Sequence, residues 1–168
     1  EHFLLLAREN RFDPLKTQGS YAGAIGIPQF MPGSWRKYAV DYDGDNRIDL
    51  ENNVADSIGS VGNYLNAHGW QKDRAVAHKA TISGKPKDAW LKAGILPTLK
   101  TEDLLTQGLT IAQTPLEIAT FIELPSPGHP TEYWLGYQNF YVITRYNKSS
   151  YYAMSVFQLA EAIKQRMK

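Results

Sequence analysis

The chain has 168 residues, 43% hydrophobic and 21% charged, which is typical of one folded core with a small second unit. Its 18 basic and 17 acidic side chains give a formal charge of +1, too small to attract nucleic acid or an anionic membrane, and we expect no nucleic-acid partner. The absence of cysteine excludes disulfides, thiolate metal sites and a cysteine nucleophile.

The chain opens on residues 2–9, which read as a buried or amphipathic helix. We expect this helix to stop near Asn10, because Asp13-Pro14 disfavours a helical conformation. No start methionine or capping residue precedes it, so we expect the chain to have been cut from a longer protein. Glycines and prolines then punctuate residues 19–33, yet the stretch stays apolar, which indicates a tightly packed loop.

Two further helices are expected before the middle of the chain. Ser34 is positioned to cap a short helix over residues 35–40. Residues 56–68 follow an acidic loop and end at Gly69, a residue that suits a left-handed helix cap. The apolar stripe of this second helix is expected to be Ile58, Val61 and Leu65.

Beyond residue 70 the pattern changes to short segments separated by Gly, Pro and Thr. Residues 116–124 alternate inward and outward over nine positions, which is typical of a strand. Residues 88–93 and 101–105 look like short helices, so this part reads as a small α+β insertion. A final helix is expected over residues 151–167, with an apolar face made by Met154, Phe157, Leu159, Ala160 and Ile163.

The clearest local pattern is the acidic run from Asp41 to Asp49, in which carboxylates alternate as they do around a hard cation. Positions one, three, five and seven of an EF-hand loop correspond to Asp41, Asp43, Asp45 and the carbonyl of Arg47. Asn46 replaces the usual glycine and Asn52 the usual bidentate glutamate, so the closing ligand must come from elsewhere, with Asp56 the nearest candidate. The alternative is an Asp-rich turn held by Asx hydrogen bonds.

A second pattern lies in residues 19–32, where small residues let the backbone pass close to another group. Ser20 and Gln29 add uncharged hydrogen-bonding groups, which suit hydroxyls and N-acetyl groups better than phosphates. The alternative is a close crossing of helix and loop in which Gln29 only satisfies backbone groups.

No complete catalytic set is recognisable in the chain. Ser20 and the four histidines, at positions 2, 68, 78 and 129, form no nucleophile motif. Glu1 and Glu9 lie on the first expected helix, where a solvated face is the simplest interpretation.

Two blocks of this sequence closely resemble the B-type lytic murein transglycosylases. The first block comprises Phe3-Leu4-Leu5-Leu6-Ala7-Arg8, Asp13-Pro14-Leu15, Gly19-Ser20-Tyr21-Ala22-Gly23-Ala24, Gln29-Phe30-Met31-Pro32, Tyr38-Ala39-Val40-Asp41 and Ala67-His68-Gly69-Trp70. The second comprises Asn139-Phe140-Tyr141-Val142-Ile143-Thr144-Arg145-Tyr146-Asn147 and Tyr152-Ala153-Met154. The blocks occur in the family's order and cover nearly the whole chain, most loosely over residues 72–130.

The resemblance implies an α+β fold: a mainly helical, goose-lysozyme-like core, here incomplete, with a small β-rich insertion and an EF-hand-like calcium loop. The expected division is 1–71 for the core with the metal loop, 72–137 for the insertion and 138–168 for the return to the core. The implied location is the periplasm of a Gram-negative bacterium, and lipid anchoring of the parent protein to the outer membrane is left open.

The implied activity is cleavage of the bond between N-acetylmuramic acid and N-acetylglucosamine without water, giving 1,6-anhydromuramoyl products. One glutamic acid acts first as acid and then as base. In the family this glutamate precedes the Phe-Leu-Leu-Leu-Ala-Arg helix, and neither Glu1 nor Glu9 has its neighbours, so we expect the acid to lie in a segment upstream of this chain.

The family's substrate contacts correspond here to Ser20, Gln29, Tyr64 and Tyr141, whereas a further family tyrosine is replaced by Leu135. The metal ligands correspond to Asp41, Asp43, Asp45, Arg47 through its carbonyl, and Asp56. Calcium is expected to be structural and not catalytic, and no organic cofactor is expected. The expected partners are the glycan strands of peptidoglycan and the absent N-terminal segment of the parent protein.

Two other functions remain open at this stage. The chain on its own is inactive in cleavage if the acid is absent, and it would then be a non-catalytic calcium- and glycan-binding module. A structural protein with an EF-hand-like loop and no sugar site is the third hypothesis.

Overall fold

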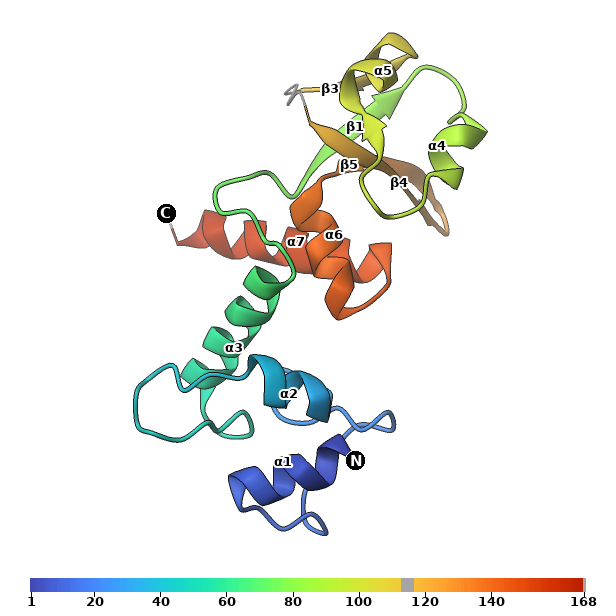
Figure 1. Cartoon of the computed structure of the whole chain (residues 1–168). Coiled ribbons are helices and arrows are strands. Elements are labelled where there is room, and N and C mark those ends of the chain that lie inside the picture. The colour runs from blue at the N-terminus through green and yellow to red at the C-terminus, as the bar shows by residue number, and fades with distance from the viewer. Residues whose placement is uncertain (113–116, 168) are drawn as a thin grey trace. The chain divides into compact units, whose positions relative to one another are not determined.

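A computed structural model describes residues 1–112 and 117–167, and the chain divides into two compact units, Glu1–His68 and Gly69–Lys168 (Figure 1). The expected mixture of helices and strands is confirmed. The finer division into 1–71, 72–137 and 138–168 remains a prediction. None of the described helices is long and apolar enough to cross a bilayer.

The first unit contains three helices, α1 (His2–Asn10), α2 (Pro32–Tyr38) and α3 (Val54–Ala67). Helix α1 ends at Asn10, as the sequence predicts. Arg11 closes it in the left-handed region, with φ 56°, and its backbone N–H donates to the carbonyl of Ala7. The amide of Phe12 donates to the same carbonyl over 3.1 Å, which turns the chain away from the helix axis.

Helix α2 starts two residues before the expected cap. Pro32 occupies its first turn, where the missing N–H has no helical partner to lose, and Met31 is the residue before it. Ser34 therefore lies inside the helix, and the prediction that it caps residues 35–40 is wrong. The buried ring of Trp35 anchors α2, 6.4 Å from the ring of Phe12.

Helix α3 is capped by Asn53, whose side-chain oxygen accepts hydrogen bonds from the amides of Ala55 and Asp56 over 2.9 and 3.2 Å. The expected apolar stripe is wrong, since Ile58 is 66% exposed. The buried residues of the helix are instead Asp56, Ser57, Ser60 and Tyr64.

Hydrogen bonds to neighbouring loops explain this polar buried face. The hydroxyl of Ser60 accepts from the amide of Val40 over 2.9 Å, and the hydroxyl of Ser57 donates to the carbonyl of Leu50 over 3.4 Å. Small hydroxyl side chains thus let loop backbone lie against α3, a role that hydrophobic periodicity does not reveal.

The second unit is built on a five-stranded antiparallel sheet of order β2-β4-β5-β1-β3 (Figure 1). Its strands are β1 (Ala77–Ile82), β2 (Leu99–Lys100), β3 (Leu109–Ile111), β4 (Ile118–Ser126) and β5 (His129–Gly136). The strand expected over 116–124 is present as β4, and Leu116 lies outside the described residues.

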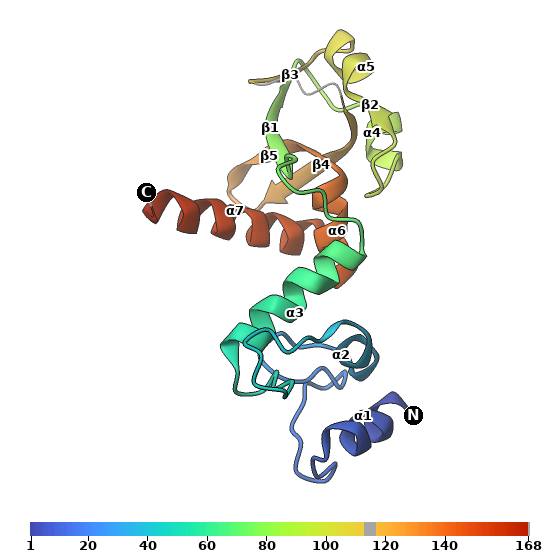
Figure 2. The same ribbon diagram turned by 60° about the vertical axis from the view of Figure 1, so that its left-hand side comes forward.

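Both faces of β4 are covered, so its residues are buried almost continuously and the expected alternation is wrong. On one face Phe121 packs with Trp90 of α4 (Asp88–Lys92) and Leu104 of α5 (Thr101–Thr106). On the other, Ile122 joins a cluster with residues of α6 (Gln138–Tyr146) and α7 (Ser150–Arg166). Figure 2 shows α6 and α7 beside the sheet.

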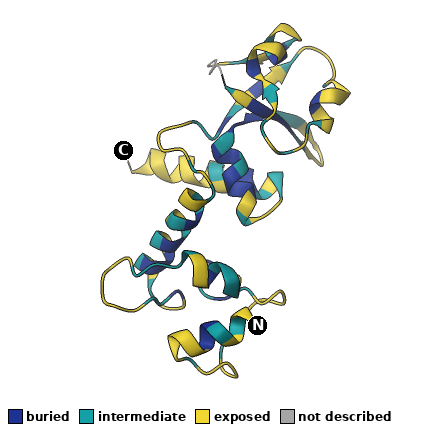
Figure 3. Ribbon diagram, viewed as in Figure 1, coloured by how far each residue is buried: buried dark blue, intermediate teal, exposed yellow. Residues whose placement is uncertain are grey.

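The final helix, α7, is buried only near its start. Ala153 and Met154 are buried, whereas Leu159 and Ile163 are 62% and 50% exposed, so the expected apolar face packs over its first part alone. Figure 3 shows the exposed C-terminal part of this helix. The side chain of Ser149 caps the other end by accepting from the amide of Tyr152 over 3.2 Å.

Candidate functional site

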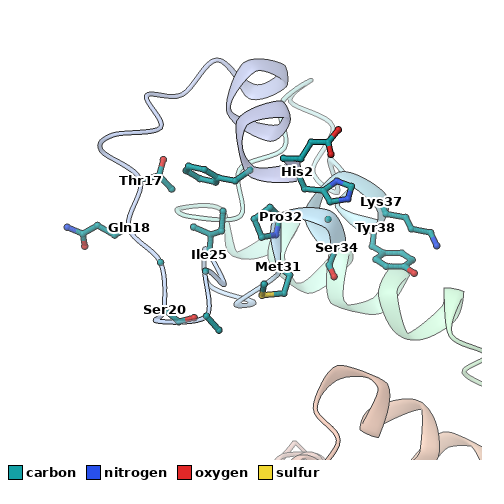
Figure 4. Close-up of a pocket in the computed structure, with 16 residues that line it drawn as sticks. His2, Thr17, Gln18, Ser20, Ile25, Met31, Pro32, Ser34, Lys37 and Tyr38 are labelled. Carbon is teal, nitrogen blue, oxygen red and sulfur yellow. The ribbon is translucent and has the colours of Figure 1, made fainter.

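The first unit contains a cavity of 790 Å³ between the start of α1, the loop that follows α1 and the face of α2 (Figure 4). Most of its walls are apolar or uncharged. Its lining residues are Glu1, His2, Phe3, Thr17, Gln18, Gly19, Ser20, Ala22, Gly23, Ile25, Met31, Pro32, Gly33, Ser34, Lys37 and Tyr38.

A closed turn places Ser20 at one end of this cavity (Figure 4). The amide of Ser20 donates to the carbonyl of Ala24 over 2.8 Å, and the amide of Ala24 donates back to the Ser20 hydroxyl over 3.1 Å. Gly23 completes the turn with φ 85°, a conformation that favours glycine. The turn holds the Ser20 oxygen in place and leaves its hydroxyl proton available for a ligand.

Gln29 is not among the residues that line the cavity. It is exposed, with φ 52°, and its side-chain Nε2 donates to the carbonyl of Gly26 over 2.9 Å. This hydrogen bond matches the alternative considered from the sequence, in which Gln29 only satisfies a backbone group. The predicted sugar contact of Gln29 stays a prediction.

Tyr64 of α3 lies behind the cavity and not on its surface. It is 8% exposed and stacks on His68 with ring centroids 4.1 Å apart. Its ring also meets the edge of Tyr38 at 5.0 Å, and Tyr38 lines the cavity. Tyr64 therefore supports the tyrosine that faces the cavity.

Tyr38, Ser34 and Lys37 line the cavity but were not predicted as site residues from the sequence. Positions 34, 37 and 38 are spaced i, i+3 and i+4, which places them on one face of a helix. The spacing could have indicated a shared helix face. It was not used because the helix was expected to begin after Ser34, which left Ser34 outside it.

Tyr141 belongs to α6 in the second unit, where it is partly buried and the guanidinium carbon of Arg145 lies 5.9 Å from its ring centroid. Its predicted sugar contact stays a prediction. Leu135, which replaces a further family tyrosine, is fully buried in the core cluster that contains Phe121.

A second candidate site is a group of three carboxylates in the first unit. Oxygen atoms of Asp41, Asp43 and Asp56 all lie within 4.8 Å of one another. Asp56 is fully buried, and its two oxygens accept from the amides of Tyr42 and Asp49, each over 2.8 Å. The carboxylate that sequence analysis suggested as the closing ligand therefore faces the acidic loop.

The loop itself is bent by its own carboxylates. Asp41 accepts from the amides of Gly44 and Asn46 over 2.7 and 2.8 Å. Asn46 adopts φ 68° at the position of the usual glycine, as asparagine tolerates. These are also the hydrogen bonds of an Asp-rich turn.

Two of the predicted ligands have other partners. Asp45 accepts from the amide of Arg47 over 2.8 Å, and the guanidinium of Arg47 lies 3.3 Å from Asp49. Asp45 is not one of the three clustered carboxylates. Its ligand role, and that of the Arg47 carbonyl, stay predictions.

The donor set fits a hard divalent cation. The pKa of Asp43 is lowered, mainly by a hydrogen bond from the Asn53 side chain, so this carboxylate is held in its charged form. Among the described residues, no Lys, Arg or His lies within ion-pair distance of the three clustered carboxylates. The buried Asp56 carboxylate has hydrogen-bond donors but no cation beside it among the described residues, and oxygen-ligated calcium would neutralise its charge.

Comparison with known proteins gives one matching family model and several similar proteins. A family model described as "Transglycosylase SLT domain" matches residues 1–161. The membrane-bound lytic murein transglycosylase B of Escherichia coli (strain K12) is 45% identical over 166 residues, which are 97% of this chain and 44% of that protein. The Escherichia coli lytic transglycosylase Slt35, solved in complex with calcium, is 44% identical with a TM-score of 0.84, over 98% of this chain and 52% of that one.

A more distant structure is also similar. SltB3 from Pseudomonas aeruginosa, solved in complex with NAG-NAM-pentapeptide, is 28% identical with a TM-score of 0.81, over 97% of this chain and 44% of that one. The chain therefore spans about half the length of the relatives it matches.

Proposed function

The chain belongs to the lytic murein transglycosylase family with the SLT domain, and from this membership we propose that it holds peptidoglycan glycan strands for cleavage. The resemblance seen in the sequence is thereby confirmed. The proposed reaction breaks the bond between N-acetylmuramic acid and N-acetylglucosamine without water. Because this chain spans about half of its relatives, the activity belongs to the proposal.

The observation that carries the proposal is the cavity of the first unit. Its walls combine apolar side chains with the hydroxyl of Ser20, the hydroxyl of Ser34 and the ring of Tyr38. Sugars present apolar faces and uncharged hydroxyl and amide groups, which such walls bind without a strong charge. SltB3 was solved with a ligand of this chemistry, NAG-NAM-pentapeptide.

The proposed reaction needs one carboxyl group with two successive roles. As an acid it gives its proton to the glycosidic oxygen while the bond from that oxygen to the anomeric carbon breaks. As a base it then takes the proton of the muramoyl 6-hydroxyl, whose oxygen bonds to the anomeric carbon. The product is a 1,6-anhydro sugar, and no water is consumed.

Glu9 is unsuited to this acid role. Arg36 donates to both of its carboxylate oxygens over 2.8 Å, and this hydrogen bonding lowers the pKa of Glu9. An acid that must deliver a proton near neutral pH needs a raised pKa. The family's catalytic glutamate precedes the segment that forms α1, and from that resemblance we propose that the catalytic carboxyl belongs to a part of the parent protein not contained in these 168 residues.

A non-catalytic calcium- and glycan-binding module is the second candidate function for the isolated chain. The ion pair between Glu9 and Arg36 supports this second function, because a carboxylate that accepts two hydrogen bonds from Arg36 is unsuited to the acid role.

A murein suspension separates the two functions. With this polypeptide alone we expect binding to sedimented murein, unchanged turbidity and no anhydro-sugar products by mass spectrometry. The longer parent protein should clear the suspension and release anhydro products. Clearing by the polypeptide alone would show that the acid lies within it, and absence of binding would contradict the glycan site.

We further propose that calcium is held by Asp41, Asp43, Asp45, the carbonyl of Arg47 and Asp56. The support is the convergence of three of these carboxylates and the calcium complex of the relative Slt35. Bound there, the ion would neutralise the buried carboxylate and tie the loop to α3, which is a structural role. No step of the proposed reaction needs it.

The proposed location is the periplasm, where peptidoglycan lies. The support is the relative's description as a membrane-bound lytic murein transglycosylase. The proposed partners are glycan strands and the remainder of the parent protein.

A further inference from the structure

We propose that Lys37 determines specificity at the cavity of the first unit by binding a carboxylate group of the peptidoglycan ligand. The inference rests on the proposed function and deepens it, because it names the charge that distinguishes the preferred ligand from a neutral sugar. Ser20 and Lys37 lie at opposite ends of the cavity in Figure 4.

Lys37 is an available cation on a cavity that is otherwise almost uncharged. It is exposed, it lines the cavity, and its Nζ lies 5.1 Å from the centroid of the Tyr38 ring. Among the described residues, no carboxylate lies within ion-pair distance of this ammonium group. Its positive charge is therefore available to a ligand.

The other ionisable groups near this end do not offer the same interaction. The Nδ1 atom of His2 lies 3.0 Å from Nη1 of Arg36, and Arg36 is itself paired with Glu9. Glu1 also lines the cavity, but a carboxylate repels an anionic ligand. Among the lysine, arginine and histidine side chains that line the cavity, Lys37 is thus the cation with which an anionic ligand would pair.

The geometry of α2 allows several side chains of one helix face to contact the same ligand. Ser34, Lys37 and Tyr38 are spaced i, i+3 and i+4, so one helix face carries a hydroxyl, an ammonium and an aromatic ring. The Tyr38 ring, backed by Tyr64, offers a flat surface for a sugar. The ammonium beside it can donate to a carboxylate on the same sugar or on a substituent.

The carboxylate has two possible sources in peptidoglycan. In a glycan strand without peptides, the lactyl group of muramic acid carries it. In a strand with peptides, the lactyl carboxyl forms an amide and the free carboxylates lie on the peptide. Both present the same chemistry to Lys37, and separate ligands distinguish them.

The test uses the polypeptide itself and three ligands: a neutral N-acetylglucosamine oligomer, a peptide-free glycan strand and a peptide-bearing strand. Calorimetric titration should give an affinity for at least one carboxylate ligand about two- to fivefold above that for the neutral oligomer, as expected for an exposed ion pair. The ligand with the gain identifies the source of the carboxylate. Raising the salt from about 0.05 M to about 0.5 M should remove the gain.

Lys37→Gln should abolish the gain, so that the carboxylate ligand and the neutral oligomer bind with similar affinity, and Lys37→Arg should retain it. Lys16→Gln is the matched control, because Lys16 is an exposed lysine of the same unit that is paired with Asp13 and does not line the cavity. It should behave as the unmodified chain.

The inference is overturned if the unmodified chain shows no preference for either carboxylate ligand. It is also overturned if Lys37→Gln lowers the affinity for the neutral oligomer as much as the affinity for the charged strands. An equal loss would show that Lys37 acts through packing at the cavity and not through its charge. In both cases binding of the neutral oligomer leaves the proposed function standing. Absence of binding of all three ligands contradicts the proposed function, and this inference fails with it.

Discussion

At the scale of single residues, polar side chains fix much of the backbone of the first unit where it has no regular structure. Asp56 holds two loop amides, Ser20 holds the amide of Ala24, and Asn53 holds the first amides of α3. Each acceptor satisfies a backbone donor that neither helix nor sheet would satisfy. Both candidate sites depend on such contacts.

Removal of the Asp56 carboxylate should destabilise the fold even without metal. In Asp56→Ala the amides of Tyr42 and Asp49 lose their acceptors, and we expect the free energy of unfolding to fall by about 2–5 kcal/mol. Asp56→Asn keeps one acceptor oxygen and should lose roughly half as much. Urea denaturation in chelator measures both, and equal stability of all three proteins would contradict this role.

The ion pair between Glu9 and Arg36 should give a pH-dependent contribution to stability. Hydrogen bonding from Arg36 lowers the pKa of Glu9 below its ordinary value of 4.5. A lowered pKa means that the pair stabilises the fold above the ordinary value and that this stabilisation disappears as the pH falls through the lowered one. At neutral pH the unmodified chain should thus have a higher melting temperature than Glu9→Gln. This difference should shrink in acid. A difference that does not change with pH would contradict it.

At the scale of elements, periodicity predicted the presence of most helices better than their buried faces. The helices near residues 2–9, 56–68 and 151–167 exist, because their apolar and capping patterns are local. The buried face of α3 was not predictable in this way, because it is set by Ser57 and Ser60 bonding to distant loops. The same limit explains β4, whose second face is covered by helices that the strand's own sequence does not reveal.

Two glycines of α3 give a matched test of this packing. A Cβ at Gly59 would overlap the Cβ and ring of Tyr42, whose backbone is held by Asp56, whereas a Cβ at Gly62 would meet nothing within 4 Å. Gly59→Ala should destabilise by about 1–3 kcal/mol. Gly62→Ala should stabilise by roughly 0.5–1 kcal/mol through helix propensity. Chemical denaturation compares them, and equal effects would contradict the close approach of the loop.

The candidate sites were predictable to different degrees. The acidic loop was predictable because its carboxylates are close in sequence. Asp56 was predicted as a further carboxylate because Asn52 stands where a standard loop has its bidentate glutamate. The cavity was only partly visible, since Ser20 lines it while Gln29 and Tyr64 do not. Lys37 and Tyr38 were missed although the helix expected over residues 35–40 contains both, because local sequence does not show that this helix packs against the loop at residues 17–25.

At the scale of the whole molecule, calcium should stabilise the first unit and thereby the chain. An ion that binds only the folded state adds about 2.7 kcal/mol at a hundredfold excess over its dissociation constant. Thermal melts with calcium and with chelator should show a higher midpoint with calcium, and Asp43→Asn should reduce the difference. Identical midpoints for the unmodified chain would count against the metal site.

The most direct test of the account is whether the cavity of the first unit binds an uncharged glycan. An isotope-labelled chain can be titrated with a neutral N-acetylglucosamine oligomer while its backbone amide resonances are followed by NMR. The shifts should concentrate in residues 17–25 and 32–38, which contain most of the residues that line the cavity. Shifts confined to residues after Gly69, or none at saturating oligomer, would contradict it.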